Sequence, residues 1–237
     1  MNIFMWSGPR NISTALMRSF ENRTDTYVWD EPFYAYYLYK TKNNHPLKEE
    51  IINKYPYNEK EIIDKISLPP PKNKYIHYQK HMTHHILEET SLDWLSKGIN
   101  CFLIRDPAEV INSYIKKNKL RSTLDLGFPN QLKLFEKVKF LNKKLIVINA
   151  NDLLINPKKI LTKLCLKINI PFEKNMLQWS KGLRETDGIW SSIWYDKVIK
   201  STGFNNYYKQ KIIIPKRFIK IYQECLLIYN TMSKYKI

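Results

Sequence analysis

The 237-residue sequence has little of what would place a chain outside the ordinary globular class. It contains only 6 glycines, which excludes a collagen-like repeat, and its hydrophobic content of 43% argues against intrinsic disorder. No apolar run approaches the roughly 20 residues that a helix needs to cross a bilayer. The apolar stretch at the N-terminus ends at Ser7-Gly8 and has no basic residue before it. It therefore indicates a first strand and not a signal peptide.

Cysteine is scarce, and the three that are present form no pattern. Cys101, Cys165 and Cys225 lie far apart among apolar neighbours, and no CxxC pair occurs. An odd number of separated cysteines argues against a disulfide framework and against a cysteine-based metal site. We therefore expect buried core residues in a reducing compartment, which predicts a cytoplasmic protein.

Acidic residues are outnumbered, since 22 Asp and Glu stand against 39 Lys and Arg and give a formal charge of +17. Such a charge is typical of proteins that bind nucleic acid. Only seven of the basic residues are arginine, however, and the lysines are spread along a chain that is also rich in asparagine, isoleucine and tyrosine. A bias in the base composition of the coding sequence explains this mixture, so we expect no specific nucleic-acid partner. The excess charge still adds a positive field around an anionic ligand.

Short apolar runs alternate with segments of helical periodicity. The runs predict strands at residues 3–7, 26–29, 75–79, 101–104 and 145–148. Helices are expected at residues 12–20, 82–88, 107–117, from 157 onward and 217–232. This alternation predicts an α/β fold, a three-layer sandwich in which helices cover both faces of a central parallel sheet. We expect one domain over residues 1–237, with the polar, proline-punctuated segment 45–71 as a lid or an excursion.

The first candidate site is the segment Gly8-Pro9-Arg10-Asn11-Ile12-Ser13-Thr14, which joins the first strand to the first helix. A helix N-terminus presents unpaired N–H groups and a positive dipole end, which favour a phosphate or sulfate. Arg10 adds a charge, and the hydroxyls of Ser13 and Thr14 can donate to anionic oxygens. The standard P-loop pattern GxxxxGK[ST] is absent, which argues against a kinase-like transferase that uses ATP. By itself the segment fits equally well a tight turn in which Ser13 caps the helix.

The second candidate site follows the fourth expected strand. Arg105 lies at the carboxyl end of that strand, where doubly wound sheets bind their ligands. Asp106-Pro107 supplies a helix cap followed by proline at the first helical position, and Glu109 completes a capping-box spacing. Ser113 lies seven residues after Asp106 and so faces the same side as the helix start. Arg105 and Ser113 are therefore placed to hold one phosphate together.

Together the two segments resemble the sulfotransferases that depend on 3′-phosphoadenosine 5′-phosphosulfate (PAPS), a family whose fold is related to that of the P-loop nucleotide-binding proteins. The family's 5′-phosphosulfate loop commonly reads P-[KR]-S-G-[ST]-T, and Pro9–Thr14 stands at that place. Its 3′-phosphate motif, R-D-P-x-x-x-x-x-S, is present in full from Arg105 to Ser113. The stretch Asn151–Pro157 is similar to a later family segment. The resemblance covers most of the chain and is closest to a bacterial sulfotransferase-like group.

The resemblance implies an enzyme that moves the sulfuryl group of PAPS to a hydroxyl or amine of a small acceptor, releases the 3′,5′-bisphosphate nucleotide (PAP) and needs no metal. It implies that the nucleotide is bound by Arg10, Asn11, Ile12, Ser13, Thr14, Arg105 and Ser113. Arg184, ahead of Asp187-Gly188-Ile189-Trp190, is similar to a late loop that closes over the nucleotide. Ile12 departs from the pattern, because glycine is usual there and tolerates backbone geometries that isoleucine resists. Either the loop differs locally, or this position does not need a positive φ.

The resemblance also suggests residues for the transfer itself. Glu31 follows the second expected strand, where several family branches carry a glutamate base, so we expect it to remove the acceptor's proton. Lys80 follows the third expected strand, where a lysine often touches the transferring sulfuryl group. His81 is a second candidate for an acceptor-side base or hydrogen-bond donor, whereas His84 and His85 are expected to be structural or to line the pocket.

Two other functions stay open at this point. Histidines at positions 81 and 85 would share a helix face as metal ligands often do, but no carboxylate stands beside them in a zincin arrangement. A relative that binds nucleotide or nucleic acid without catalysis would keep the same fold, because fold alone does not establish function.

Overall fold

The computed structural model describes residues 1–141, 143–204, 207–208 and 211–237. In this part of the chain one sheet has five strands in the order β2-β3-β1-β4-β5, and all neighbouring pairs are parallel. The strands are β1 (Asn2–Ser7), β2 (Thr26–Asp30), β3 (Ile76–Met82), β4 (Ile99–Ile104) and β5 (Ile146–Asn149). All five strands expected from the apolar runs are present, so the predicted parallel sheet is confirmed.

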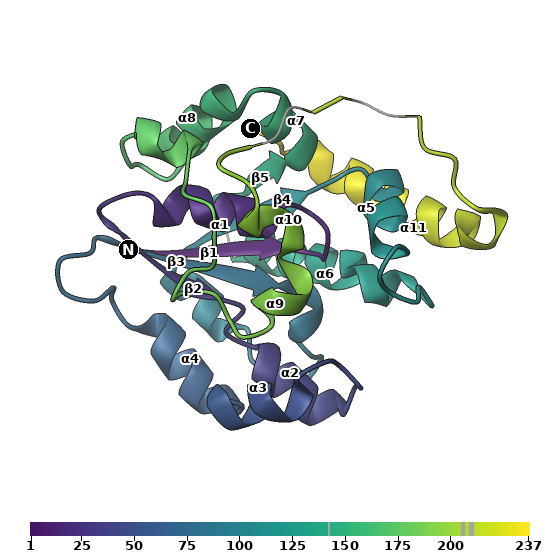
Figure 1. The fold of residues 1–237 in the computed structure, drawn as a ribbon, viewed down its shortest axis with the longest axis horizontal. Coiled ribbons are helices and arrows are strands. Elements are labelled where there is room, and N and C mark those ends of the chain that lie inside the picture. Colours follow the sequence, from purple (N-terminus) through teal and green to yellow (C-terminus); the bar gives the residue numbers. More distant parts are fainter. Residues whose placement is uncertain (142, 205–206, 209–210) are drawn as a thin grey trace.

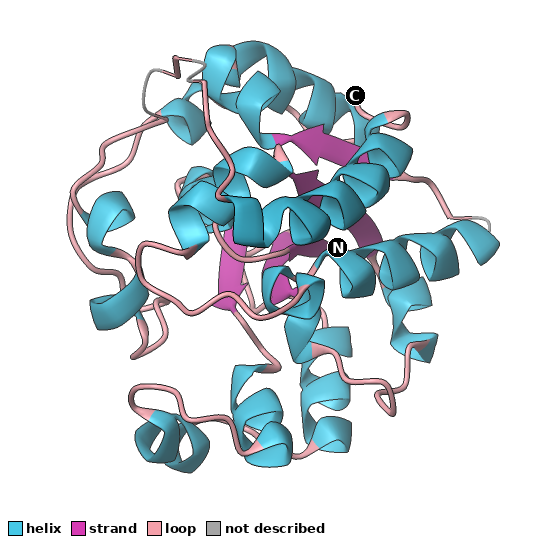
Figure 2. Ribbon diagram, turned by 90° about the vertical axis from the view of Figure 1, so that its right-hand side faces the viewer, coloured by secondary structure: helices cyan, strands magenta, loops and turns pink. Residues whose placement is uncertain are grey.

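Helices cover both faces of this sheet (Figures 1 and 2). The helices of the described residues are α1 (Ser13–Glu21), α2 (Tyr34–Thr41), α3 (Lys48–Lys54), α4 (Glu59–Ser67), α5 (Pro107–Tyr114), α6 (Phe128–Phe140), α7 (Ala150–Ile155), α8 (Pro157–Lys167), α9 (Ser191–Trp194), α10 (Asp196–Ile199) and α11 (Ile219–Ser233). Helices α1 and α8 pack on one face, while α4, α6 and the end of α11 pack on the other. The fold is therefore the predicted three-layer sandwich. Among the described residues we find no helix long and apolar enough to cross a membrane.

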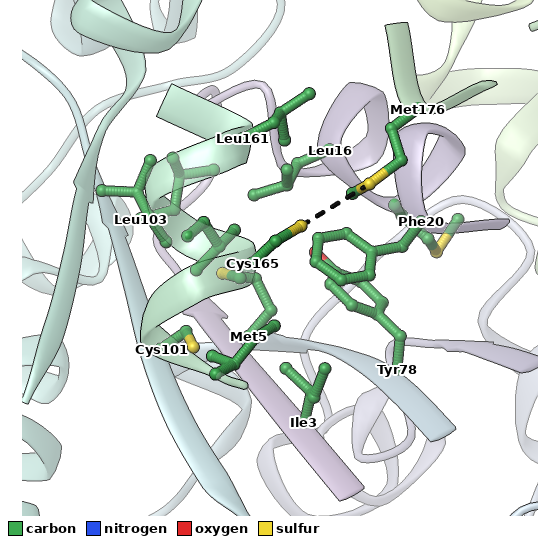
Figure 3. Close-up of a cluster of buried hydrophobic side chains, with 14 of the residues drawn as sticks. Ile3, Met5, Leu16, Phe20, Tyr78, Cys101, Leu103, Leu161, Cys165 and Met176 are labelled. Carbon is green, nitrogen blue, oxygen red and sulfur yellow. Dashed lines mark hydrogen bonds between the residues drawn. The ribbon is translucent and has the colours of Figure 1, made fainter. Parts of the chain in front are cut away.

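The core between the sheet and α1 with α8 is shown in Figure 3. Alternate side chains of the strands point into it, including Ile3 and Met5 of β1. Leu16 and Phe20 of α1 meet them from above, and the ring of Phe20 stacks on that of Tyr78 at 4.5 Å between centroids. Cys101, Cys165 and Cys225 are buried and free, as the sequence predicts. This packing fixes α1, and therefore the loop before it, against β1.

Polar caps start the helices where the sequence places them. The Asp106 carboxylate accepts a hydrogen bond from the Ala108 N–H at 2.8 Å, and Pro107 is the first residue of α5. The predicted capping box with Glu109 does not form. The Glu109 carboxylate instead accepts hydrogen bonds from the guanidinium of Arg105, at 2.9 and 2.7 Å.

Two segments differ from the sequence-based expectation. The helix expected at residues 82–88 is absent: β3 continues to Met82 and is followed by a 3₁₀ turn over Thr83–His85. Ladder pairing decides this, because β1 is long enough to pair with β3 as far as Met82. The segment 45–71 contains α3 and α4, and Ile62 and Ile66 of α4 are completely buried in the core. This segment therefore contributes side chains to the core.

The order of the strands creates a switch point between β1 and β4. The chain leaves β1 through α1 towards β2 on one side, whereas it leaves β4 through α5 towards β5 on the other. Open parallel sheets bind their ligands in the crevice that such a reversal leaves at the carboxyl ends of the strands. Register pairs Ser7 with both Leu103 and Met82, so the ends of β1, β3 and β4 reach one edge. The two segments that the sequence singles out leave the sheet at this crevice.

Candidate active site

The loop after β1, residues 8–14, has the backbone of an anion-binding turn; we call it the anion loop. Arg10 and Ile12 have φ values of 65° and 59°, in the left-handed region. Left-handed residues within such a turn let successive N–H groups converge on one point, which is how protein backbones form anion nests. Asn11 holds the turn closed, because its side-chain amide donates to the carbonyl oxygens of Gly8 at 2.8 Å and Pro9 at 3.2 Å. The geometry of the loop thus fits a phosphate or sulfate group.

Gly8 is needed for close packing at the start of the anion loop. A Cβ atom there would lie 2.3 Å from the carbonyl oxygen of Leu126, which is far inside van der Waals contact. The loop is therefore held against the segment before α6.

The N-terminus of α1 lies directly behind the anion loop. Within the described residues no side chain caps it, and its first turn has no acidic residue. The alternative that Ser13 caps the helix is therefore wrong, because Ile12 occupies the cap position and Ser13 is the first helical residue. An uncapped helix N-terminus leaves N–H donors and a partial positive charge available to an anion. Ser13 and Thr14 both stand in this first turn.

Ile12 needs the positive φ that its side chain resists. Neither alternative drawn from the sequence holds: the position does require left-handed backbone, and isoleucine adopts it with φ 59° and ψ 20°. For a β-branched residue this conformation is an outlier, at a cost of about 1–2 kcal/mol. The Ile12 side chain packs against the core beneath α1, which helps to hold it there. Strain of this kind is concentrated at functional sites.

The second segment contacts the anion loop through its arginine and serine. The Arg10 guanidinium donates from Nε to the Ser113 hydroxyl at 2.9 Å, and Arg105 donates from Nη1 to the Arg10 carbonyl at 2.9 Å. Burial and the neighbouring Arg105 charge lower the pKa of Arg10. Two guanidinium groups this close favour an anionic partner. Arg105 is meanwhile engaged with Glu109, so a bound phosphate would have to compete with this carboxylate.

Glu31 and Lys80 lie together in a buried group that we call the carboxylate–lysine cluster: Asp30, Glu31, Lys80, Trp190 and Tyr195. Lys80 belongs to β3 and does not follow it, and register pairs it with Asp30 at the end of β2. Its ammonium donates to Asp30 at 2.7 Å, to Glu31 at 2.5 Å and to the Tyr195 hydroxyl at 2.8 Å. An ammonium has three N–H donors, and these contacts use all of them. Contact between Lys80 and a sulfuryl group would therefore require one of them to be exchanged.

Glu31 occupies an unusual backbone position directly after β2. Its φ is 47°, and its N–H donates to the Lys80 carbonyl at 2.9 Å, which fixes the turn before Pro32. Burial, more than any other effect, raises the pKa of the Glu31 carboxyl, and the neighbouring Asp30 charge adds to this while Lys80 opposes it. A carboxylate whose pKa is raised is a stronger base than an ordinary glutamate, as a group that accepts a proton requires.

The sequence reasoning missed Asp30 and Tyr195 as members of the site. The Asp30 side chain contacts Lys80 at the end of β2. The signal that could have found Asp30 is its strand-end position opposite Lys80. Tyr195 has no such signal, because it reaches the cluster across 165 residues from Asp30.

His81 lies apart from Glu31 and Lys80. Successive residues of a strand point to opposite faces, so His81 faces away from Lys80. Its ring stacks on Trp6 at 4.6 Å and contacts the rings of Phe4, Phe33 and Trp94. Burial lowers the pKa of His81 to about 3, so the ring is a weak base at this position. His81 is therefore an aromatic core residue in this structure.

His85 does approach Glu31, with Nδ1 at 3.9 Å from the Glu31 carboxylate. Its ring lies between Tyr34 and Tyr37, with centroids at 4.7 and 4.9 Å. Burial lowers its pKa well below the usual value, so it is uncharged at neutral pH. Among the described residues, no group of three or more His, Cys, Asp or Glu side chains is placed to hold a metal ion.

Arg184 is not brought to the anion loop. Its guanidinium lies 3.8 Å from the Glu21 carboxylate and donates from Nη2 to the carbonyl of Ser180, and its backbone N–H donates to the Asp187 carboxylate at 2.8 Å. Glu21 ends α1, and eight residues of helical rise, about 12 Å, separate it from Ser13. The neighbouring Asp187 carboxylate pairs with Arg18 on the same end of α1 at 2.5 Å. The late segment is therefore anchored at the far end of this helix.

Known proteins are similar to this chain in sequence and in fold. Two Arabidopsis thaliana proteins, named branched-chain-amino-acid aminotransferase-like proteins 2 and 1, are each 32% identical to this chain over 97% and 98% of its length. The chain spans only 41% and 42% of those proteins, less than half of their length. We therefore do not transfer the activity in their name to this chain.

Solved structures show the same architecture. A sulfotransferase domain from the curacin biosynthetic pathway aligns with a TM-score of 0.59 and 19% identity, over 98% of this chain and 96% of that domain. A sulfotransferase domain from the olefin synthase of Synechococcus PCC 7002 aligns with a TM-score of 0.56 and 12% identity, over 98% and 94%. The family model described as sulfotransferase domain matches residues 1–233, and the chain therefore belongs to the sulfotransferase domain family.

Proposed function

We propose that the protein is a PAPS-dependent sulfotransferase that sulfates a hydroxyl or amine of a small acceptor. The observation that carries the proposal is the junction of Arg10, Arg105 and Ser113 at the crevice between β1 and β4. A nucleotide with phosphate groups at both its 5′ and 3′ positions needs two anion sites at one edge of a sheet. The anion loop with the N-terminus of α1 supports the first, and Arg105 with Ser113 supports the second.

The residues present fit this nucleotide. The left-handed residues Arg10 and Ile12 shape a backbone cradle, and the uncapped first turn of α1 carries Ser13 and Thr14. We propose that Arg10, Asn11, Ile12, Ser13 and Thr14 hold the 5′-phosphosulfate. Arg105 would exchange part of its pairing with Glu109 for the 3′-phosphate, and Ser113 would donate its hydroxyl to the same group. Arg184 takes part only if the late segment moves from its anchor at Glu21.

PAPS, when bound, supplies an activated sulfuryl group. The acceptor's oxygen or nitrogen forms a bond to sulfur, the bond from sulfur to the 5′-phosphate oxygen breaks, and its electron pair leaves with that oxygen. Glu31 takes the proton that the acceptor loses. Arg10 and the N–H groups of the anion loop stabilise the charge that develops on the leaving phosphate. Lys80 holds the Glu31 carboxylate in position through their 2.5 Å contact.

Arginine provides the positive charge for this reaction, so we propose that it needs no metal. The three free cysteines, all buried, suit a cytoplasmic location, which we also propose. The excess of basic residues would add a general field that attracts the anionic nucleotide, without a specific nucleic-acid partner.

The test is transfer of ³⁵S from labelled PAPS to acceptors in a metabolite extract, with and without EDTA. We expect a labelled product and equal rates in both conditions. Calorimetry with PAP and with ADP provides a check that needs no acceptor, and we expect PAP to bind at least tenfold more tightly, about 1.4 kcal/mol. Equal affinity for the two nucleotides would contradict the proposal. Binding of PAP without any transfer would instead favour a non-catalytic relative.

A further inference from the structure

Tyr195 lies at the centre of the carboxylate–lysine cluster. It stands between α9 and α10, and its side chain is buried. Its hydroxyl donates to the Asp30 carboxylate at 2.6 Å and accepts from the Lys80 ammonium at 2.8 Å. Neither the catalytic residues expected from the sequence nor the proposed reaction gives this buried hydroxyl a role.

The two carboxylates of the cluster accept different numbers of hydrogen bonds. Asp30 accepts from Lys80, from the Tyr195 hydroxyl and from the Trp190 indole at 3.2 Å, and the Gly188 N–H lies at 3.4 Å. Glu31 receives one short bond, from Lys80, and a long contact of 3.5 Å with the Tyr195 hydroxyl. Hydrogen bonds to a carboxylate favour its charged form. The hydrogen-bonding capacity of Asp30 is therefore largely used within the cluster, and Glu31 is the carboxylate left free to take a proton.

Solvent exposure also distinguishes the two carboxylates. The side chain of Glu31 is 11% exposed and that of Asp30 only 1%. Only Glu31 therefore presents surface that an acceptor could reach. Tyr195 faces both groups and has its own pKa raised well above the usual value by burial, so it remains a protonated donor.

The segment that carries Tyr195 also contacts the residues that follow α5. The next residue, Asp196, forms an ion pair with Lys117, shortly after the end of α5. Two adjacent residues thus connect the cluster at the ends of β2 and β3 with the segment after α5.

We propose that Tyr195 is a positioning residue whose hydroxyl, by donating to Asp30, keeps the Lys80 ammonium shared with Glu31, the carboxylate that takes the acceptor's proton. This inference rests on the proposed sulfotransferase function. The charged and titratable groups that face Glu31 are Asp30 on β2, Lys80 on β3, His85 in the 3₁₀ turn, Tyr34 on α2 and Tyr195 itself. When the Tyr195 hydroxyl is removed, Lys80 is expected to shift towards Asp30, and Glu31 then loses its cation.

The variant Tyr195→Phe removes one oxygen and keeps the ring. We expect turnover to fall about tenfold near pH 6 and less at pH 8, with the KM for PAPS unchanged, because Glu31 then holds its proton to higher pH. Tyr55→Phe is the matched control, since its hydroxyl accepts from the Ile189 N–H in the same segment and its ring contacts Trp190. Tyr55→Phe should keep the wild-type pH profile even where it lowers stability. An unchanged profile in Tyr195→Phe would overturn the inference.

A measurement that does not need activity separates this inference from the proposed function. The full-length protein with ¹³C-labelled side-chain carboxyl groups is titrated by NMR, and Glu31 and Asp30 are assigned by Glu31→Gln and Asp30→Asn. We expect Glu31 to titrate above the ordinary range of a glutamate in the wild type, and to titrate higher still in Tyr195→Phe. Titration of Glu31 within or below the ordinary range in the wild type overturns the inference even if Tyr195→Phe fails to fold. The expected titration together with no ³⁵S transfer supports the effect of Tyr195 on Glu31 and counts against the proposed function.

Discussion

Arg10 and Ser113 are 103 positions apart in the chain, and the Arg10 guanidinium donates a 2.9 Å hydrogen bond to the Ser113 hydroxyl. This bond joins the loop after β1 to the helix after β4, across the point where the strand order reverses. Arg105 reinforces it by donating to the Arg10 carbonyl. The two segments are therefore joined as the two arms of the proposed anion site, and substitutions in each arm should have different effects on the two phosphates of a nucleotide.

The arm formed by Arg105 should select the 3′-phosphate. Arg105→Ala is expected to weaken PAP binding by roughly 1.5–3 kcal/mol, about one to two decades, because a charge-assisted contact is lost. Adenosine 5′-phosphate lacks the 3′ group and should lose much less. Calorimetry with both nucleotides measures the difference. Arg217→Ala removes the same charge at an exposed position and should leave both affinities unchanged. Equal losses for the two nucleotides in Arg105→Ala would refute the assignment.

The left-handed backbone at position 12 should favour glycine over any residue that has a Cβ atom. A comparison of alanine with glycine isolates this effect, because alanine has no side-chain atom beyond Cβ. With φ at 59°, Ile12→Gly is expected to be more stable than Ile12→Ala by about 1–2 kcal/mol. Denaturant unfolding of the two variants measures this difference. At Ala15, inside α1, the preference should reverse, and Ala15→Gly should cost about 1 kcal/mol. An Ile12→Ala variant as stable as Ile12→Gly would show that the left-handed strain is absent.

The position of both segments in the fold could be predicted because each is local in the sequence. An apolar strand that ends at Gly8 or at Arg105 and leads into a helix determines where the following polar residues stand. The placement of Lys80 and His81 was harder to predict from the sequence, because the length of β3 depends on its pairing with β1. Once both are in a strand, alternation sends them to opposite faces, and the sequence could not separate the two roles.

The contacts of the carboxylate–lysine cluster could not be predicted. Asp30 and Lys80 are neighbours only because β2 pairs with β3, and Tyr195 joins them through the packing of a late segment. Such long-range side-chain contacts leave no periodicity or spacing in the sequence. The same holds for the Ile12 backbone, whose positive φ is imposed by the loop against the preference of the residue.

Buried histidines should make the protein less stable as the pH falls. Burial lowers the pKa of His81 and of His84 to about 3 and that of His77 to about 4. Between the ordinary pKa of about 6.5 and these values, the unfolded chain binds protons that the folded chain does not. Stability is therefore complete above about pH 6.5 and decreases towards pH 4. His81→Gln should reduce the slope by about 1.4 kcal/mol per pH unit in this range.

Unfolding free energies measured in denaturant at several pH values check this slope. Trp94→Phe is the control, because Trp94 packs on the His81 ring but does not titrate. It should lower stability by a similar amount at every pH. A slope in His81→Gln equal to that of the wild type would mean that His81 binds its proton equally well in the folded protein.

The sharpest test of the mechanism is an experiment that identifies the residue acting as the base. Glu31→Gln keeps the size of the side chain and can still accept from Lys80, but it removes the oxygen that takes the proton. It should lower turnover by roughly two to four decades while PAP affinity barely changes, because the anion site is formed by other residues. The pH profile of the wild type should rise along a limb that lies above the ordinary pKa of a glutamate, since burial raises the pKa of Glu31.

His81→Gln should keep near-normal turnover at pH 7.5, because His81 lies in the aromatic core on the opposite face of the sheet. Near-normal turnover in Glu31→Gln together with a large loss in His81→Gln would make His81 the base. Full activity in both variants would mean that the acceptor reaches the site already deprotonated, so that Glu31 has no role in proton transfer.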